Sequence, residues 1–268
     1  MRTSRSPSRT TKPPPPSHSI WPWILIALIA VVSVAVCVIP ASVIGRFLPT
    51  IVRAEDFSGS LWHGSAGRIW IAERDAGALE WRLHPGALLH LAIDADFHWV
   101  KVGFVINGRT TIDRTGFAAR DVQGAGPLQD LRDLGLDANW HGSAQIAMLE
   151  ITGTFTELKS AVGRVAVANV STPQLAGGAD WGGYTLELPP GAVEADGAVN
   201  AVLSDSGGPL EFQGRARISP TQRIGTLAGT VKERDGAALP LRRQLADLAQ
   251  MRGRDSAGRI PIDLEFTF

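Results

Sequence analysis

Cysteine is almost absent from this chain of 268 residues, because Cys37 is the only one. A lone thiol forms no internal disulfide and no multi-thiolate metal site. The fold therefore has to be stabilised by its packed core rather than by covalent or metal cross-links.

Charge is absent between Lys12 and Arg46, where no Lys, Arg, Asp or Glu occurs. Within this stretch, residues 21–39 are almost continuously apolar. A helix of that length crosses a hydrocarbon core of about 30 Å. The apolar stretch is longer than the ~7–15 residues of a signal-peptide core, and no small-residue cleavage site follows it. We therefore predict an uncleaved transmembrane helix at residues 19–40.

Acidic residues are absent from the segment before that helix, which carries Arg2, Arg5, Arg9 and Lys12. The positive-inside rule predicts that residues 1–18 form a cytoplasmic tail and that residues 41–268 lie on the far side of the membrane. Since the chain has 26 basic and 26 acidic residues, the part beyond the tail has a net charge of −4. This charge gives no general electrostatic attraction to nucleic acid.

Beyond a predicted linker at residues 41–56, apolar and polar residues alternate, which is typical of strands with one buried face. Two short helices are predicted at residues 127–134 and 240–252, because each begins with Pro and is followed by Gly. The many glycines within strands predict bulges and bends. The expected fold is mainly β: a strongly curved, half-barrel-like antiparallel sheet with an apolar concave face. The strand candidates are residues 79–83, 91–99, 102–106, 145–158, 164–169, 184–188, 198–203, 210–218, 224–231 and 260–268.

The dipeptide Asn107-Gly108 has two interpretations. It is either a hairpin turn or a bulge within a longer strand that turns at residues 113–116.

One pentapeptide, Trp-His-Gly-Ser-Ala, occurs at residues 62–66 and again at residues 140–144. The repeat suggests two β-rich halves of similar design within the domain 57–268, namely residues 57–139 and 140–268. We interpret it as a packing device in which a large tryptophan anchors a strand and small residues allow close approach of another. Both tryptophans are expected to be largely buried, near the starts of comparable strands.

The surroundings of the first copy resemble the type II secretion system protein N family. Similar phrases also occur around the second copy and at residues 208–214, and the resemblance covers most of residues 43–268. The structural motif that carries the resemblance consists of Gly59, Leu61, Trp62, Gly64, Ala66, Trp81, Pro85, Trp140, Gly142 and Ala144.

The resemblance implies a single-pass protein of the cell inner membrane with a periplasmic β domain. It implies a non-enzymatic role in exporting folded proteins across the outer membrane. The partners would be other components of the secretion system or the exported protein, and no catalytic residue, cofactor or metal is implied. The alternative is an anchored lipid-handling protein with an apolar β-groove, as in AsmA-like proteins.

An enzyme is the third class, since residues 205–210 resemble the nucleophile segment of chymotrypsin-like serine proteases. Ser206 would be the nucleophile. However, residue 204 is Ser where that family has Gly, and no alanine-alanine-histidine phrase supplies a general base. We therefore expect a glycine-rich hairpin loop.

Two groups of histidines have residue types that could bind a metal ion. His90, Asp94, Asp96 and His98 alternate as on one strand face, but His90 and His98 would then be roughly 26 Å apart. Zinc ligands all lie within about 2.3 Å of the ion. His63 and His141 share the repeat without a carboxylate or thiol at fixed spacing. A solvated strand face is expected for both groups.

Overall fold

The computed structural model describes residues 39–46, 48–130, 139–173 and 176–267. The chain divides into two compact units, Met1–Ile39 and Pro40–Phe268. Almost all of the predicted transmembrane helix and the whole cytoplasmic tail lie outside the described residues. Within the described ranges, no helix combines the length and apolarity that a membrane crossing needs.

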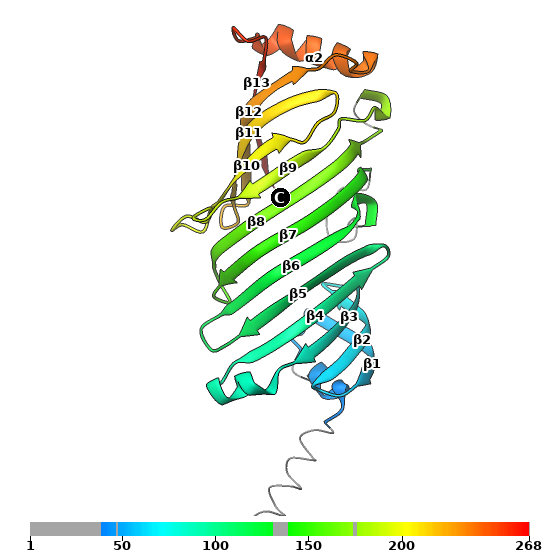
Figure 1. The fold of residues 1–268 in the computed structure, drawn as a ribbon, viewed down its shortest axis with the longest axis vertical. Helices are drawn as coiled ribbons and strands as arrows, with labels where there is room; N and C mark the ends of the chain where they lie inside the picture. The colour runs from blue at the N-terminus through cyan, green and yellow to red at the C-terminus, as the bar shows by residue number, and fades with distance from the viewer. Residues whose placement is uncertain (1–38, 47, 131–138, 174–175, 268) are drawn as a thin grey trace, which may run out of the picture. The chain divides into compact units, whose positions relative to one another are not determined.

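In the described part of the second unit, 13 strands form one antiparallel sheet, in which each strand pairs with its neighbours in chain order (Figure 1). The sheet is open, with β1 and β13 at its edges. The predicted mainly β antiparallel sheet is confirmed, and the strong curvature expected of a half-barrel is not supported. The strands are β1 (Val52–Gly59), β2 (His63–Ile71), β3 (Arg74–Leu83), β4 (Ile93–Lys101), β5 (Phe104–Ile112), β6 (Phe117–Pro127), β7 (His141–Gly153), β8 (Leu158–Ser171), β9 (Tyr184–Leu188), β10 (Val199–Asp205), β11 (Leu210–Ser219), β12 (Ile224–Glu233) and β13 (Ile260–Thr267).

The strand registers divide the side chains between two faces, because successive residues of a strand point to opposite sides. We call the first the apolar face, and one row of paired residues crosses all its strands: Phe57, Ala66, Leu79, Trp99, Ile106, Gly124, Ile146, Val165, Leu186, Leu203, Gly214, Gly229 and Ile262. The other is the polar face, and its matching row is Ser58, Ser65, Glu80, His98, Asn107, Gln123, Ala147, Arg164, Glu187, Val202, Arg215, Ala228 and Asp263.

Of the two interpretations of Asn107-Gly108, the longer strand is confirmed. β5 continues to Ile112, and the chain turns at residues 113–116. The irregularity lies opposite, on β6, where Asp121 adopts a φ of 52° and the register shifts between Asn107 and Arg109. Gly108 is needed within the strand, since an added Cβ would lie 2.9 Å from the Phe97 ring and from Val122.

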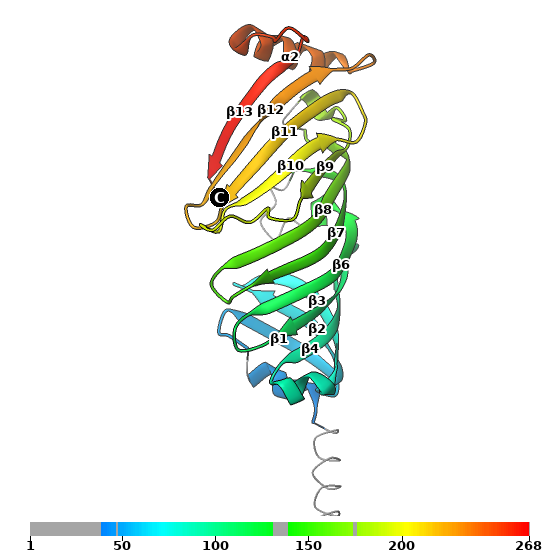
Figure 2. The same ribbon diagram turned by 60° about the vertical axis from the view of Figure 1, so that its left-hand side comes forward.

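Few helices accompany the sheet in the described ranges. The predicted helix at residues 240–252 is confirmed as α2 (Leu239–Arg252), which lies beside the ends of β12 and β13 (Figure 2). Short 3-10 segments are η1 (Ala41–Arg46), η2 (Pro85–His90) and η4 (Ala176–Gly178). The predicted helix at residues 127–134 falls largely outside the described residues, although residues 128–130 form a 3-10 turn.

Two boundaries differ from the sequence prediction. Residues 41–56, expected to be a linker, contain η1 and the first half of β1. The expected strand at residues 145–158 is divided by a turn, in which the Thr154 hydroxyl accepts a hydrogen bond from the backbone N–H of Glu157 (3.0 Å). A threonine turn of this kind carries a weaker sequence signal than Gly or Pro.

Core side chains gather on the apolar face in several clusters. At the β13 edge, Leu241 and Leu245 of α2 pack against Phe212, Val231 and Ile260. Near the β1 edge, the buried residues are Ala41, Ala66 and Trp81, with η1 beside them. The first cluster is therefore covered by a helix, whereas among the described residues the second is backed by a short 3-10 segment.

Candidate functional site

The two tryptophans of the repeat occupy equivalent positions, since Trp62 directly precedes β2 and Trp140 directly precedes β7. Both are partly buried and neither is exposed. This is less burial than expected, and the packing role of the repeat stays a prediction. The tryptophan buried deepest in this region is Trp81, which is 8% exposed.

Small residues of the first copy fit closely around Trp81. The indole Nε1–H of Trp81 donates to the backbone oxygen of Leu61 (2.9 Å), and Phe57 packs edge-on against the ring. A Cβ added to Gly64 would lie 2.8 Å from the Trp81 ring and 2.6 Å from the backbone oxygen of Ser60. Gly59 has a φ of 80°, Ala66 is buried beside Trp81, and Pro85 begins η2.

The second copy has the same pattern of small residues. Gly142 has a φ of 134°, and an added Cβ would lie 2.7 Å from the backbone oxygen of Ala168. Ala144 is buried at 3% exposure. The Trp140 ring meets that of Trp181 edge-on at 6.2 Å. In both copies the geometry is one of close packing, without a group placed for chemistry.

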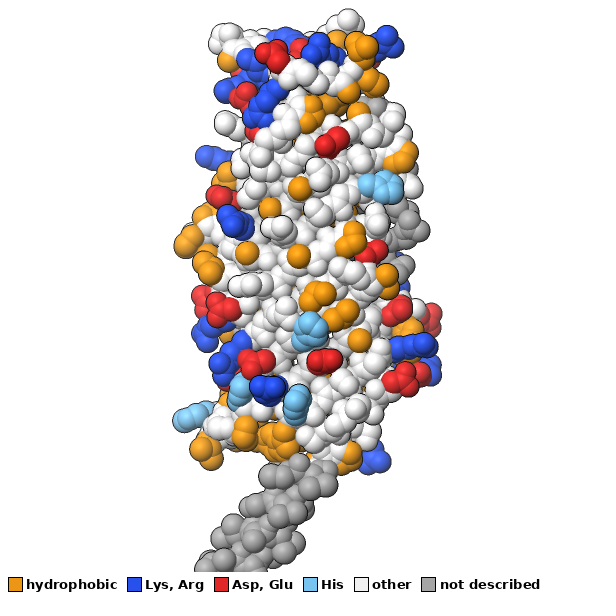
Figure 3. All heavy atoms as spheres, turned by 45° about the vertical axis from the view of Figure 1, so that its right-hand side comes forward, with side chains coloured by type: hydrophobic (Ala, Val, Ile, Leu, Met, Phe, Trp, Pro, Cys, Tyr) orange, Lys and Arg blue, Asp and Glu red, His pale blue; other side chains and the backbone are white. Residues whose placement is uncertain are grey.

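The polar face carries a charged cluster over β3, β4 and β5, made of His84, Asp94, Asp96, His98, Asn107 and Arg109. The Arg109 guanidinium donates two hydrogen bonds to Asp94 (3.0 and 2.8 Å), and these hold the pKa of Asp94 below its usual range. Nε2 of His84 contacts Asp96 at 2.9 Å, and the His98 ring contacts Asn107. Figure 3 shows charged and histidine side chains gathered over these N-terminal strands.

This arrangement corrects the view that His90 shares a strand face with the other three residues. His90 ends η2, whereas Asp94, Asp96 and His98 alternate along β4. The carboxylates are paired with Arg109 and His84. No group of three or more potential metal ligands is found among the described residues.

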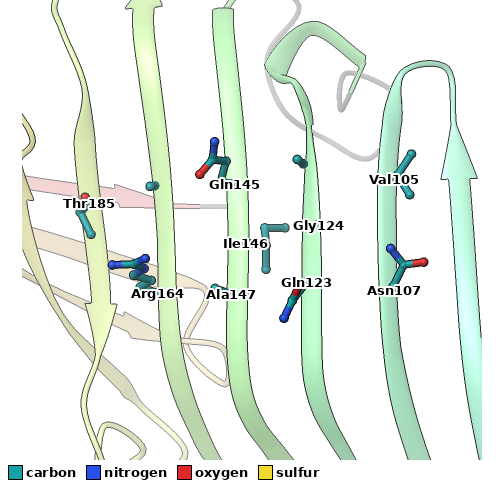
Figure 4. Close-up of a pocket in the computed structure, with 11 residues that line it drawn as sticks. Val105, Asn107, Gln123, Gly124, Gln145, Ile146, Ala147, Arg164 and Thr185 are labelled. Carbon is teal, nitrogen blue, oxygen red and sulfur yellow. The ribbon is translucent and has the colours of Figure 1, made fainter.

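A polar groove of about 430 Å³ continues the polar face from β5 to β9 (Figure 4). The groove is lined by small residues, among them Gly124, Ala125 and Ala147, and by side chains that can form hydrogen bonds. Those side chains are Asn107, Gln123, Gln145, Arg164 and Thr185. Amide and guanidinium groups of this kind bind polar or extended partners by hydrogen bonds. Sequence reasoning missed this groove, because its residues come from five separate strands.

An apolar cavity of about 660 Å³ lies on the other face, over β1 to β6. Thr110 is the one hydroxyl residue among the described residues that line it, and the indole N–H groups of Trp81 and Trp99 donate to backbone oxygens of Leu61 and Ala76. The lining consists of Ile44, Leu48, Val52, Ala54, Phe57, Ala66, Ile69, Ile71, Ala76, Leu79, Trp81, Leu83, Ile93, Ala95, Phe97, Trp99, Thr110, Ile112 and Ala119.

Ser206 lies in an exposed loop between β10 and β11, as the hairpin interpretation predicted. The preceding Asp205 organises this loop by accepting hydrogen bonds from the backbone N–H groups of Gly207 and Phe212 (both 3.1 Å) and pairing with Arg234 (2.6 Å). The histidines with ring contacts, His84, His98 and His141, bind Asp96, Asn107 and Gln129 instead. None of these described histidine contacts places a general base beside Ser206.

His63 and His141 are not brought together. His63 begins β2 and His141 begins β7, with β3 to β6 between them. At about 4.8 Å per strand, their backbones are roughly 24 Å apart across the sheet. A shared histidine site is therefore excluded.

A comparison with protein-family models agrees with the resemblance seen in the sequence. Comparison with curated proteins and with solved structures found no match. The model of one family, type II secretion system (T2SS), protein N, matches residues 51–263. This range begins just before β1 and extends into β13, so it covers nearly the whole sheet. The chain therefore belongs to the type II secretion system protein N family.

Proposed function

We propose that this protein is a non-enzymatic component of the type II secretion machinery that assists export of folded proteins through contacts made by its β domain. The family match over residues 51–263 is the observation that carries the proposal. Support also comes from the two sites described above, whose linings offer hydrogen-bonding groups in one case and apolar side chains in the other.

The proposed location is the inner membrane, with residues 19–40 as the anchor, residues 1–18 in the cytoplasm and the β domain in the periplasm. The uncharged stretch between Lys12 and Arg46 and the basic residues before it support this topology. The proposed roles of Gly64, Ala66, Gly142 and Ala144 are in packing, because their surroundings leave no room for larger side chains.

The polar groove is the surface that we assign to a protein partner, either another secretion component or the exported protein. Its floor of small side chains admits a chain segment, and its amides and Arg164 supply donors and acceptors at the sides. Ala147 lies exposed in this groove, whereas Ala228 lies exposed on the same face but on β12. The two alanines make a matched pair for testing the assignment.

The test combines deletion and crosslinking in the native host. Deleting the gene should reduce the secretion of folded enzymes, and the wild-type chain should restore it and stay in the inner-membrane fraction after a carbonate wash. A photoreactive benzoylphenylalanine at position 147 should crosslink to a secretion component, and the same group at position 228 should not. Unchanged secretion on deletion, together with equal or absent crosslinks at both positions, would contradict the proposal.

A lipid-handling role, as in AsmA-like proteins, is favoured by a separate observation, the apolar cavity over β1 to β6. The two roles are compatible because the cavity and the polar groove lie on opposite faces of the sheet. A cavity that keeps phospholipid through purification would support the lipid role, and one that yields no lipid by mass spectrometry would count against it.

A further inference from the structure

The chemistry of the apolar cavity restricts what can fill it. Its volume of about 660 Å³ lies within the range of roughly 300–1,000 Å³ that is usual for small-molecule sites. The indole N–H groups in its wall are already paired with backbone oxygens, which leaves the Thr110 hydroxyl as its polar group among the described lining residues. An extended peptide here would leave its own backbone N–H and C=O groups buried and unpaired, which is strongly unfavourable. A hydrocarbon chain has no such groups.

Large hydrophobic side chains are exposed at one end of this cavity. Ile93 and Ile112 line it, pair across β4 and β5, and are 47% and 37% exposed. η2 directly precedes β4 at the same end, where Leu88, Leu89 and Leu91 are also exposed, Leu89 at 86%. Single exposed leucines are ordinary, but a contiguous group of this kind marks an interaction surface.

The same end of the sheet is where the chain enters the second unit. Pro40 forms a bridge with Ser60 in the turn between β1 and β2, and the residues that follow this turn pair with the end of β3. The apolar stretch at residues 21–39 ends directly before Pro40. That stretch is therefore joined in sequence directly to the end of the sheet that carries the η2 leucines and the open end of the cavity.

We propose that the apolar cavity binds the acyl chain of a membrane lipid, which enters past Ile93 and Ile112 while the η2 leucines contact the bilayer. The proposal rests on the inner-membrane location proposed for this chain. It goes further by naming the ligand class, the wall that holds it and the end at which it enters. The head group stays outside, because the described lining offers it no charged partner.

The test uses the full-length chain in living cells fed a palmitate that carries a photoreactive diazirine and a clickable alkyne. After irradiation, the chain is purified and its lipid adducts are mapped by mass spectrometry. Trypsin releases residues 83–101, which contain both η2 and the cavity wall of β4. We expect adducts on Ile93, Ala95 or Phe97, in addition to those on residues 21–39, which serve as an internal standard for contact with lipid.

Two adjacent alanines of β6 make the matched variants, because Ala119 lines the cavity and Ala118 points to the polar face, paired with Thr111. Ala119→Trp should lower the number of adducts on the cavity wall about tenfold, because the indole would fill space that the acyl chain occupies. Excluding ~2 methylene groups of the acyl chain from the cavity already weakens its binding by roughly that ratio. Adducts on the η2 leucines and on residues 21–39 should persist. Ala118→Trp should be labelled like the wild type. Ala119→Phe should lose an intermediate amount of cavity-wall labelling, and such a graded loss would not be expected from a misfolded chain.

Equal wall labelling in Ala119→Trp and Ala118→Trp would overturn the proposal. So would wild-type adducts confined to residues 21–39, or a photoreactive group at position 119 that crosslinks to a protein rather than to lipid. The readout is independent of secretion. A chain that is labelled in the cavity but is dispensable for secretion would leave the lipid site standing while the secretion role fails.

Discussion

The two ends of the apolar face are built from similar side chains but are completed differently. At the β13 edge, α2 places Leu241 and Leu245 against Phe212 and Ile260, and Ile260 becomes fully buried. Over β1 to β6, a comparable set of aromatic and aliphatic residues surrounds a cavity, and Ile71, Ile93 and Ile112 stay exposed. A helix within the chain turns an apolar sheet face into a core, and where no described helix covers it the same face keeps an open cavity.

The largest difference is expected between Leu245→Ala and Ile93→Ala. Leu245 is 7% exposed on the buried side of α2, so its truncation leaves a void and should lower the free energy of unfolding by about 2–5 kcal/mol. Ile93 is 47% exposed, so its truncation should cost less than about 1 kcal/mol. Urea unfolding of the full-length chain, followed by tryptophan fluorescence, measures both. Equal losses would show that the cavity end is packed as tightly as the α2 end.

A smaller effect is expected from glycines at the cavity end. Gly64→Ala should cost about 1–3 kcal/mol, because the new methyl group would lie 2.8 Å from Trp81 and 2.9 Å from the Ala41 side chain.

Gly86→Ala in η2 is the control, since no atom lies within 4 Å of its added Cβ. This substitution should be neutral or stabilise the fold by a few tenths of a kcal/mol. If Gly64→Ala were equally neutral in the same unfolding assay, the first tryptophan motif would not be a packing device.

Much of the sheet could be predicted from the sequence, because alternation reports directly which residues share a face. The Tyr184–Leu188 strand and the Pro-initiated helix before Gly253 are found at or within a residue of their expected limits. The boundaries that failed lack strong signals. The turn after Gly153 depends on the Thr154 hydroxyl, and the bulge opposite Gly108 depends on Asp121 adopting a positive φ.

The sites were harder to predict than the strands. The tryptophan repeat correctly marked equivalent strand starts, but the residue that it packs around is Trp81, which lies on the next strand. The polar groove and the apolar cavity are each assembled from several strands, so residues far apart in sequence become neighbours only through the register. An apolar face was expected, but alternation alone does not show which part of it the described helices cover.

The smallest expected effect concerns pH, at the α2 end. Asp205 is 9% exposed, and burial alone would raise its pKa. Hydrogen bonds from Arg234 and from the backbone N–H groups of Phe212 and Gly207 outweigh burial and hold the pKa of Asp205 below its usual range. In the unfolded chain that carboxyl titrates near pH 3.9.

Since the unfolded state then binds the proton first, the stabilisation by Asp205 is complete above about pH 5 and is lost as the pH falls through 3.9 toward the folded pKa. Unfolding midpoints in urea between pH 6 and pH 3 should therefore fall less steeply for Asp205→Asn than for the wild type. Arg234→Met should show the same reduced slope, because it removes the partner that keeps the carboxylate ionised. Parallel slopes for all three proteins would mean that Asp205 does not contribute to the acid sensitivity of the protein. The stability of the α2 end would then depend on the apolar packing between α2 and the sheet.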